Sequence, residues 1–224
     1  MSATDVLRKV PLFSDLSEAD LASFAEVTRE REYPKNSVIL FEDDPGDSLY
    51  IVSAGQVKVV LIGEDGREVI LSVLGDGDFF GEMALIDDEP RSAHVIAMKD
   101  SHLLVLRRDD FQSQVATHPQ IALKLLRVLV QRLRRADEKI GGLVLLDVNG
   151  RVARLLLDLA DESGGPKITR RLTHHTIAQM IGSSRETVSR AMRELVDRGL
   201  IETTRREISI KNREGLAALT GART

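Results

Sequence analysis

The stretch Ser183-Ser184-Arg185-Glu186-Thr187-Val188-Ser189-Arg190 decides how the last third of the chain folds. Hydrophobic residues recur at helical spacing here and predict one buried face, made of Val188, Met192 and Leu195. The polar residues of the stretch gather in the first two turns of the same helix. Ser183 stands three residues before Glu186, the spacing of a capping box, so either Ser183 or Ser184 begins this helix.

A second helix is predicted immediately before this stretch. Thr173 can begin it, because a threonine hydroxyl accepts a hydrogen bond from a free amide at a helix start. Gly182 ends it, because glycine enters the left-handed C-terminal cap without steric cost. The apolar face between them consists of Ile177, Ala178 and Ile181. Two helices joined by a tight glycine turn predict a helix-turn-helix, whose second helix enters the major groove of DNA.

The polar side of the second helix suits contacts with bases. An arginine can donate two hydrogen bonds to guanine, and a glutamate can accept one from cytosine. Arg185, Glu186 and Arg190 are therefore candidate base-contacting residues. Two short β runs, 200–203 and 207–210, predict a wing whose tip carries Arg205 and Arg206, facing DNA phosphates. The alternatives are an ordinary amphipathic helix with solvated arginines, followed by a solvated turn.

Composition limits the remaining possibilities. A chain of 224 residues holds one large or two small domains, and the absence of cysteine excludes disulfides, thiol catalysis and cysteine-ligated metal centres. From residue 146 onward there are 14 Lys and Arg against 10 Asp and Glu, whereas the rest has 17 against 25. A basic C-terminal third on an acidic body suits a DNA-binding domain joined to a regulatory one.

Several kinds of site and segment are not recognisable in the sequence. We find no signal peptide and no apolar run of the ~18 residues that a membrane span needs, so we expect a cytoplasmic protein without membrane contact. Neither paired carboxylates nor a Ser/His/Asp set has catalytic spacing, and the histidines are scattered. We therefore expect neither an enzyme nor a metal protein.

The first half of the chain predicts helices followed by a β roll. Residues 5–32 have helical spacing and are assigned to packing. From 37 to 107, short β runs alternate with turns rich in glycine, aspartate and proline, which is typical of an antiparallel roll or barrel. The expected strands are 38–41, 49–53, 57–62, 69–73, 93–97 and 103–106.

An interruption at 79–93 predicts an anion pocket. Gly81 and Glu82 lead into a short helix with Met83 and Ala84, and amides at a helix start bind phosphate. Arg91 adds a planar charged fork, Ser92 adds a hydroxyl, and Glu82 can accept from a sugar hydroxyl. The alternative is a surface ion pair between Arg91 and the acidic residues of the loop before it, Asp87, Asp88 and Glu89.

A long helix is predicted from 111 to 140, with a break near His118-Pro119. Apolar residues at alternating steps of four and three form a heptad seam: Ala122, Leu126, Leu129, Leu133, Ala136 and Ile140. A second face packs on the roll and contains Leu123, Leu125 and Val130. Two faces that need burial predict a second copy of the chain as partner, the alternative being a helix buried in a monomer. Gly141-Gly142 is the expected hinge.

The chain resembles the CRP/FNR family of transcription regulators, and within it the cyclic-AMP receptor branch. Four motifs carry the resemblance, which covers about residues 12–210: Phe80-Gly81-Glu82-Met83-Ala84-Leu85 with Arg91-Ser92-Ala93, Glu138-Lys139-Ile140-Gly141, the run 145–153, and Ser184-Arg185-Glu186-Thr187-Val188-Ser189-Arg190. It implies an α+β fold with a cyclic-nucleotide-binding β roll (1–117), a long dimerisation helix with hinge (118–141) and a C-terminal winged helix-turn-helix (142–224). The implied partners are double-stranded DNA, a second copy of the chain and RNA polymerase.

The resemblance also implies residue roles. Glu82 would hold the ribose 2′-hydroxyl, and Arg91 and Ser92, with the backbone from Gly81 to Ala84, would hold the cyclic phosphate. Arg185, Glu186 and Arg190 would contact bases of a TGTGA-N6-TCACA palindrome. The other DNA-contacting candidates are Thr173, Ser184, Thr187, Ser189, Arg205 and Arg206.

One departure from the family concerns the base of the nucleotide. Cyclic-AMP receptors usually place two adjacent hydroxyl residues against adenine, whereas this chain has Ala136 and Asp137. Alanine cannot form a side-chain hydrogen bond, and aspartate can accept one from an exocyclic amine. Cyclic AMP is the expected effector, while cyclic GMP, a cyclic dinucleotide or activity without ligand stay open.

Overall fold

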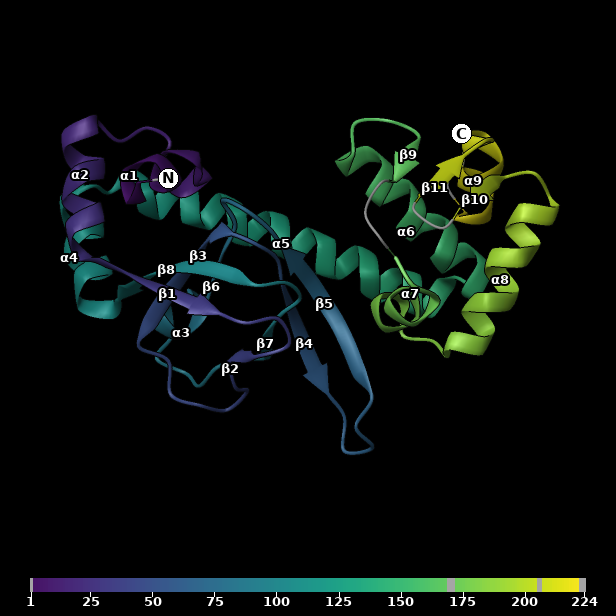
Figure 1. Cartoon of the computed structure of the whole chain (residues 1–224), viewed down its shortest axis with the longest axis horizontal. Helices are drawn as coiled ribbons and strands as arrows, with labels where there is room; N and C mark the ends of the chain where they lie inside the picture. Colours follow the sequence, from purple (N-terminus) through teal and green to yellow (C-terminus); the bar gives the residue numbers. More distant parts are fainter. Residues whose placement is uncertain (1, 169–171, 205–206, 222–224) are drawn as a thin grey trace. The chain divides into compact units, whose positions relative to one another are not determined.

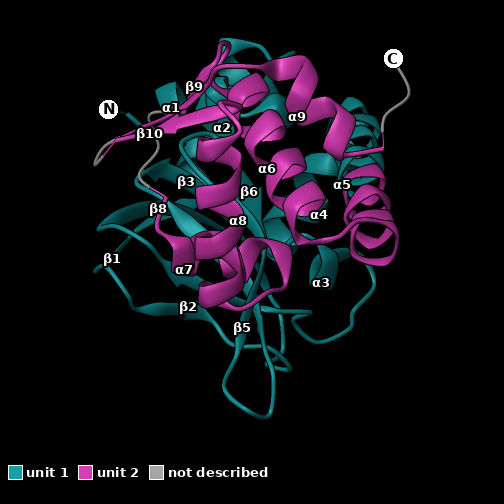
Figure 2. Cartoon of the chain, turned by 90° about the vertical axis from the view of Figure 1, so that its right-hand side faces the viewer, with its two compact units in different colours: residues 1–132 teal, residues 133–224 magenta. Residues whose placement is uncertain are grey.

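The computed structural model describes residues 2–168, 172–204 and 207–221, and the order of its elements can be followed in Figure 1. The chain divides into two compact units, residues 1–132 and 133–224 (Figure 2). The division falls inside one long helix, α5 (Gln120–Leu145). The two units are described separately below.

Unit 1 begins with two capped helices and a short 3-10 turn: α1 (Ala3–Lys9), η1 (Pro11–Phe13) and α2 (Glu18–Val27). At the start of α2, the Ser17 hydroxyl accepts from the Asp20 amide (3.2 Å), and the Asp20 carboxylate accepts from the Ser17 amide (3.3 Å). Phe13 and Phe24 pack in the core with ring centroids 4.8 Å apart. The caps fix where the helices start, and the aromatic pair fixes how they pack.

The prediction that residues 5–32 are helical was wrong at its end. Residues 28–33 form the edge strand β1 (Thr28–Tyr33), which pairs along its whole length with β8 (Ser101–Arg107). Residues 29–32 are all charged, so no hydrophobic period marks the change from helix to strand. Pairing with a strand about 70 residues away in sequence decides the structure here, and local pattern cannot detect it.

Two four-stranded antiparallel sheets form the body of unit 1, ordered β1-β8-β3-β6 and β2-β7-β4-β5. One apolar cluster lies between the two sheets and contains Val52, Val57 and Leu103, while Leu49, Ile51 and Leu104 from the other face of the first sheet join the core beneath the helices. This arrangement confirms the predicted β roll. The remaining strands are β2 (Val38–Leu40), β3 (Ser48–Ala54), β4 (Val57–Ile62), β5 (Glu68–Leu74), β6 (Phe79–Phe80) and β7 (His94–Ala97).

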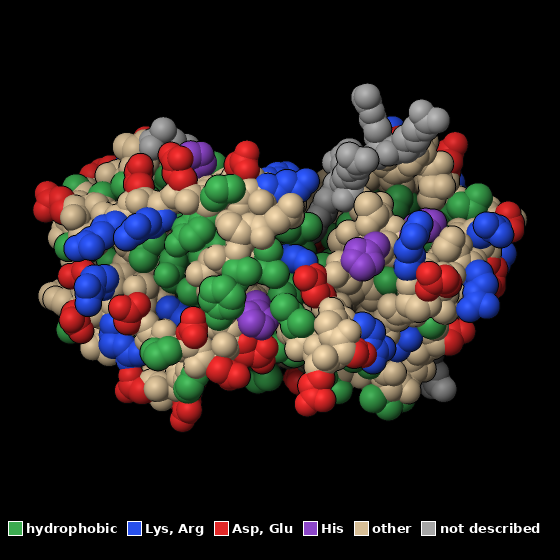
Figure 3. Space-filling model, turned by 60° about the horizontal axis from the view of Figure 1, so that its bottom comes forward, with side chains coloured by type: hydrophobic (Ala, Val, Ile, Leu, Met, Phe, Trp, Pro, Cys, Tyr) green, Lys and Arg blue, Asp and Glu red, His purple; other side chains and the backbone are tan. Residues whose placement is uncertain are grey.

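The β4–β5 pair is apolar on its solvent side as well as on its core side. Leu61, Ile62 and Val69 are each more than one third exposed. Figure 3 shows hydrophobic side chains (green) open to solvent on one face of the molecule. Period-two burial is therefore incomplete in this pair, because both faces carry aliphatic side chains.

Helix α4 (Arg108–Thr117) ends just before Pro119, and α5 follows as a helix of 26 residues. The break predicted near His118-Pro119 is therefore present. The predicted hinge at Gly141-Gly142 is not visible as a break, because α5 continues through both glycines to Leu145. The Leu146 amide still donates to the Gly142 carbonyl (3.1 Å), so the helical hydrogen bonds offset the low helix propensity of two glycines.

Helix α5 packs on unit 1 through Ile121 and Leu125, with Val128 and Leu129 beside them. Of the second face predicted to pack on the roll, only Leu125 is buried. The opposite side carries an exposed apolar stripe, whose members are 49–76% exposed and lie 3, 4, 3, 7 and 4 residues apart: Leu123, Leu126, Val130, Leu133, Ile140 and Val144. We call this set the α5 stripe. It has heptad spacing, but its register differs from the predicted one and places Asp137 in the gap between Leu133 and Ile140.

Unit 2 contains a winged helix-turn-helix, as predicted. A three-stranded antiparallel sheet of order β10-β11-β9 packs with the helices. The short strand β9 and the last helix α9 were not foreseen. The elements after α5 are α6 (Val148–Glu162), β9 (Lys167–Ile168), α7 (His174–Ile181), α8 (Arg185–Asp197), β10 (Ile201–Thr203), β11 (Ile208–Ile210) and α9 (Arg213–Leu219).

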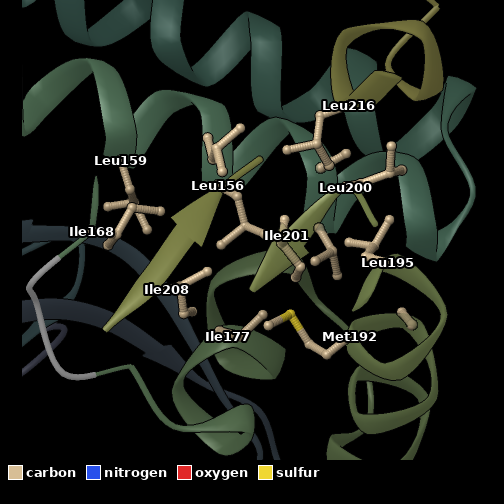
Figure 4. Close-up of a cluster of buried hydrophobic side chains, with 14 of the residues drawn as sticks. Leu156, Leu159, Ile168, Ile177, Met192, Leu195, Leu200, Ile201, Ile208 and Leu216 are labelled. Atoms are coloured by element: carbon tan, nitrogen blue, oxygen red, sulfur yellow. The ribbon is translucent and has the colours of Figure 1, made fainter. Parts of the chain in front are cut away.

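The core of unit 2 is one aliphatic cluster, shown in Figure 4. Leu156 of α6 lies near its centre and is fully buried, together with Ile177 of α7 and Leu195 of α8. Because these residues come from three different helices, their packing sets the angle between α7 and α8 and holds the first turns of α8 in place.

Leu156→Ala should lower the free energy of unfolding of unit 2 by about 2–5 kcal/mol, because it leaves a cavity where three helices meet. Val196→Ala on the exposed side of α8 is the matched control and should change it by no more than about 0.5 kcal/mol. Urea denaturation followed by circular dichroism measures both. Equal losses for the two variants would contradict the packing described here.

Candidate functional site

Arg91 lies at the centre of the predicted anion pocket and is only 5% exposed. Its two terminal nitrogens donate to backbone carbonyls, Nη1 to Gly81 (2.8 Å) and Nη2 to Ser48 (2.9 Å). Its Nε is buried and has no hydrogen-bond partner within the structure. Carbonyls cannot neutralise the guanidinium, so the site keeps a buried positive charge and a donor nitrogen, Nε, without an acceptor.

The net effect of the surroundings of Arg91 is to lower the pKa of its guanidinium. Burial lowers the pKa of its guanidinium, and Tyr50, Asp47 and Glu82 raise it. The Tyr50 ring lies 5.9 Å from the guanidinium carbon, and no described carboxylate forms an ion pair with Arg91. The surface ion pair considered from the sequence is thus not formed, and Asp88 of the acidic loop pairs with Arg108 instead.

Gly81 lets the backbone turn around Arg91. Its φ of +83° lies in the left-handed region that favours glycine, and a Cβ there would lie 2.7 Å from Arg91 Nη1. The turn links β6 to α3 (Met83–Ile86), a single turn of helix in which Glu82 takes the N-cap position. The sequence therefore needs glycine here for two reasons, backbone conformation and space.

Glu82 is 2% exposed, and its carboxylate is already bound. Arg132 of α5 donates from Nη1 to Glu82 Oε1 (2.6 Å) and from Nη2 to the Phe79 carbonyl (2.6 Å). The Arg132 guanidinium carbon also lies 4.9 Å from the centroid of the Phe79 ring. Sequence reasoning missed Arg132, although it is four residues before Ala136 and so shares a helix face with it.

The other pocket candidates lie close by. The Ser92 hydroxyl is exposed and lies 3.7 Å from the sulfur of Met83, so these two side chains meet at the surface of the site. Ala84 is buried, and its carbonyl accepts from Arg108 Nη2 (2.6 Å). Arg108 also donates to the Gly46 carbonyl (2.6 Å), and sequence reasoning missed this role because none of its partners is near it in sequence.

The structure thus brings Gly81, Glu82, Met83, Ala84, Arg91 and Ser92 together in unit 1. Ala136 and Asp137 lie in the part of α5 that belongs to unit 2, and both are exposed. Asp137 falls in the gap of the α5 stripe, whereas Ala136 lies beside the stripe.

In unit 2, side-chain caps fix the helix-turn-helix as predicted. The Thr173 hydroxyl accepts from the Thr176 amide (3.0 Å) and begins α7, and Gly182 ends it with φ of +63°. Of the two serines considered, Ser184 begins α8, where its hydroxyl accepts from the Thr187 amide (3.1 Å). Thr173 and Ser184 are both exposed, so capping leaves them accessible.

The first two turns of α8 present polar side chains to solvent. Arg185, Glu186 and Arg190 are exposed, and Thr187 and Ser189 are half-buried beside them. Arg190 Nη2 lies 3.4 Å from the Thr187 hydroxyl. Strands β10 and β11 form the predicted wing, with Ile201 opposite Ile210. Arg205 and Arg206 lie outside the described residues.

Two family models match the chain in agreement with this geometry. The cyclic nucleotide-binding domain matches residues 30–118, and the Crp-like helix-turn-helix domain matches residues 150–219. The chain belongs to the CRP/FNR family of transcription regulators. The family is thus the one that the sequence motifs indicated, and its members named in the comparisons are transcription regulators, not enzymes.

Individual relatives agree with this assignment. The chain is 34% identical over 218 residues to the CRP-like cAMP-activated global transcriptional regulator of Mycobacterium tuberculosis, covering 95% of this chain and 97% of that one. The structure of this chain is similar to that of FixK2 from Bradyrhizobium japonicum, with a TM-score of 0.77 and 27% identity over 88% of this chain and 100% of that one. It is also similar to the c-di-GMP responsive global regulator CLP from Xanthomonas campestris (TM-score 0.75, 26% identity, 87% and 99% covered).

As a CRP/FNR-family regulator, the chain combines a DNA-binding domain with a cyclic-nucleotide-binding domain. Across the described ranges, no helix is both long and apolar enough to cross a membrane. The same residues contain no group of three or more His, Cys, Asp or Glu side chains that could hold a metal ion.

Gly81→Ala should destabilise unit 1 more than Gly66→Ala does. Both positions have positive φ, +83° and +76°, so both substitutions impose backbone strain of about 1–2 kcal/mol. Only at Gly81 does the new methyl group also collide with Arg91, since nothing lies within 4 Å at Gly66. Urea denaturation of both variants measures the difference, and equal losses would show that Gly81 serves backbone conformation alone.

Proposed function

We propose that this protein is a homodimeric transcription regulator of the cytoplasm whose binding to DNA is gated by cyclic AMP. The dimer binds a TGTGA-N6-TCACA-like palindrome and acts on RNA polymerase. One observation carries the effector part of this proposal, namely the buried guanidinium of Arg91 with its unused Nε.

A cyclic phosphate suits this site because it offers what Arg91 lacks. Its anionic oxygens accept from Nε and neutralise a charge that carbonyls leave uncompensated. The Ser92 hydroxyl and the backbone around Gly81 supply further donors at the same surface. A singly charged phosphodiester fits one arginine, and the acidic loop of Asp87, Asp88 and Glu89 disfavours more highly charged ligands here.

The sugar of the nucleotide would connect the pocket with α5. Glu82 is the proposed acceptor for the ribose 2′-hydroxyl, and its carboxylate already accepts from Arg132 of α5. A carboxylate can accept several hydrogen bonds, so the ribose hydroxyl can donate to Glu82 in addition to Arg132 or in place of it. Either way, occupancy of the pocket changes the strength with which α5 is held, and a ligand shifts an equilibrium only through such a difference in affinity.

Dimerisation is proposed from the α5 stripe. A row of exposed aliphatic residues at heptad spacing is costly in water, and a second copy of the same helix buries it by knobs-into-holes packing. A two-fold dimer also places two recognition helices about 34 Å apart, one turn of DNA, which matches the palindrome.

Recognition of bases is assigned to α8. Arg185 and Arg190 each present an exposed planar fork for guanine, and Glu186 between them can accept from cytosine. The caps Thr173 and Ser184, together with Thr187, lie at helix starts, where backbone amides attract phosphate. Arg205 and Arg206 are proposed to extend the phosphate contacts.

Asp137 favours cyclic GMP as the second candidate effector. A residue in the gap of the α5 stripe faces the partner helix in the proposed dimer, where the family places the base. A carboxylate can accept two parallel hydrogen bonds from the adjacent N–H groups on the Watson–Crick edge of guanine, but only one from the exocyclic amine of adenine. The name of the Mycobacterium relative supports cyclic AMP as the effector, whereas the hydrogen-bonding capacity of Asp137 supports cyclic GMP.

Fluorescence anisotropy on a TGTGA-N6-TCACA duplex at fixed salt tests the gating. Cyclic AMP should increase DNA affinity at least about tenfold, a coupling of typical size. Arg91→Gln should abolish this gain, while Arg67→Gln, which removes an exposed charge on the β4–β5 turn, should retain it. A larger gain with cyclic GMP would assign the effector to the second candidate, and tight binding without any nucleotide would overturn the gating.

Arg185→Ala should weaken binding to the palindrome by about 1–3 kcal/mol and relax the preference at one base pair of each half-site. Arg198→Ala is the control, because Arg198 lies at the far end of α8 and pairs with Glu194. Anisotropy on the palindrome and on duplexes with single base-pair changes measures both effects. If Arg185→Ala weakened all duplexes equally, Arg185 would be a phosphate contact and not a base contact.

A further inference from the structure

A second basic pocket lies on the sheet β1-β8-β3, outside the Arg91 site. Its volume is about 230 Å³. Its lining contains three arginines, both tyrosines of the chain and one carboxylate: Arg29, Arg31, Arg107, Tyr33, Tyr50 and Asp47. We call this pocket the arginine groove. Such a concentration of positive charge stands out in a part of the chain where acidic residues prevail.

The alternation of strand β1 produces the arginine groove. Successive side chains of a strand point to opposite faces, so Arg29 and Arg31 share one face while Glu30 and Glu32 lie on the other. On that other face, Glu32 Oε1 lies 3.5 Å from His102 Nδ1. The strand therefore separates its charges, and its own carboxylates do not neutralise its arginines.

The strand register then sets the spacing of the arginines. Arg29 lies opposite Val105 of β8, and Arg107 follows two residues later on the same face. Residues two apart in a strand are separated by roughly 7 Å along the backbone, so the arginine side chains start from separate points on the sheet and can reach different charged groups of one molecule. None of the three forms an ion pair with a carboxylate of the described residues.

Tyr50 lines the arginine groove and also lies near Arg91. Burial raises the pKa of the Tyr50 hydroxyl, Tyr33 raises it further, and Arg91 and Arg31 lower it. Tyr50 is therefore close to both arginines, and its ring also stacks on Phe80 with centroids 5.2 Å apart. Its hydroxyl is a neutral donor near Arg31 and Arg91, and its ring lies 5.9 Å from the guanidinium carbon of Arg91.

We propose that the arginine groove binds a small polyanion with at least two phosphoryl groups, at a site distinct from the Arg91 pocket. Guanidinium forks bind phosphate in bidentate fashion, and three forks at strand spacing match several charged groups on one molecule. The pocket is smaller than a typical site for a drug-sized ligand, which favours a compact anion. Because Tyr50 borders both sites, anion binding here should alter the environment of Arg91.

Tyrosine fluorescence of the full chain tests this directly, since the chain has two tyrosines and no tryptophan, and both tyrosines line the groove. Inorganic pyrophosphate, which carries no aromatic group, is titrated at constant ionic strength. We expect a saturable change in emission. The double variant Arg29→Gln/Arg31→Gln should weaken binding by at least about tenfold, whereas the charge-matched double control Arg8→Gln/Arg67→Gln, with both sites exposed elsewhere on unit 1, should bind as the unchanged protein does.

Three results would overturn the proposal. Loss of pyrophosphate binding in Arg91→Gln, with binding kept in Arg29→Gln/Arg31→Gln, would place the anion in the Arg91 pocket. Equal weakening in the control double variant would show only diffuse charge attraction. Binding of a hexaglutamate peptide through the same arginines, without binding of pyrophosphate, would make the groove a docking surface for an acidic protein segment. The response of DNA binding to cyclic AMP is measured separately on the same variants, so the two proposals fail independently.

Discussion

The buried guanidinium of Arg91 is the constraint on which the rest of unit 1 depends. A positive charge at 5% exposure has a large desolvation cost, and the fold offsets it with two carbonyl acceptors, Ser48 of β3 and Gly81 in the turn after β6, and not with a carboxylate. Gly81 must then adopt positive φ so that its carbonyl reaches the guanidinium without a Cβ in the way. The site therefore combines a strained backbone at Gly81 with an Arg91 Nε that has no acceptor, and a bound anion would supply that acceptor.

Arg132 extends this constraint to the long helix. It pairs with Glu82, which directly follows Gly81, so the pocket and α5 share one charged contact. The side of α5 away from the pocket carries the exposed apolar stripe. One helix therefore has a charged contact with the pocket on one side and an exposed apolar stripe on the other. A change at Glu82 can reach the stripe through a rigid element, without any need for a long chain of side-chain contacts.

An element was predicted correctly when the residues that stabilise it lie close to it in the sequence, and missed when they lie far along the chain. The caps at Thr173 and Gly182 were predicted because both partners of each contact lie within four residues. Strand β1 was missed because residues 29–32 are all charged and their structure is set by β8. The carbonyl partners of Arg91 lie 10 and 43 residues away and carry no side-chain signal. Heptad spacing was visible in α5, but periodicity alone cannot tell which of two apolar faces is covered, and the exposed α5 stripe has another register than the predicted seam.

The register of the α5 stripe gives Asp137 another position in the proposed dimer than the predicted seam does. The predicted seam includes Ala136 and leaves Asp137 beside it, whereas Asp137 falls in the gap of the exposed α5 stripe and would face the partner helix in the proposed dimer. In a parallel helix pair, residues at one seam position meet their own copies, so the proposed dimer brings two carboxylates toward each other. Like charges at that distance oppose association unless each meets a donor. A nucleotide base whose N–H groups reach Asp137 would supply that donor, and the same contact would then select the base and favour the dimer arrangement that binds DNA.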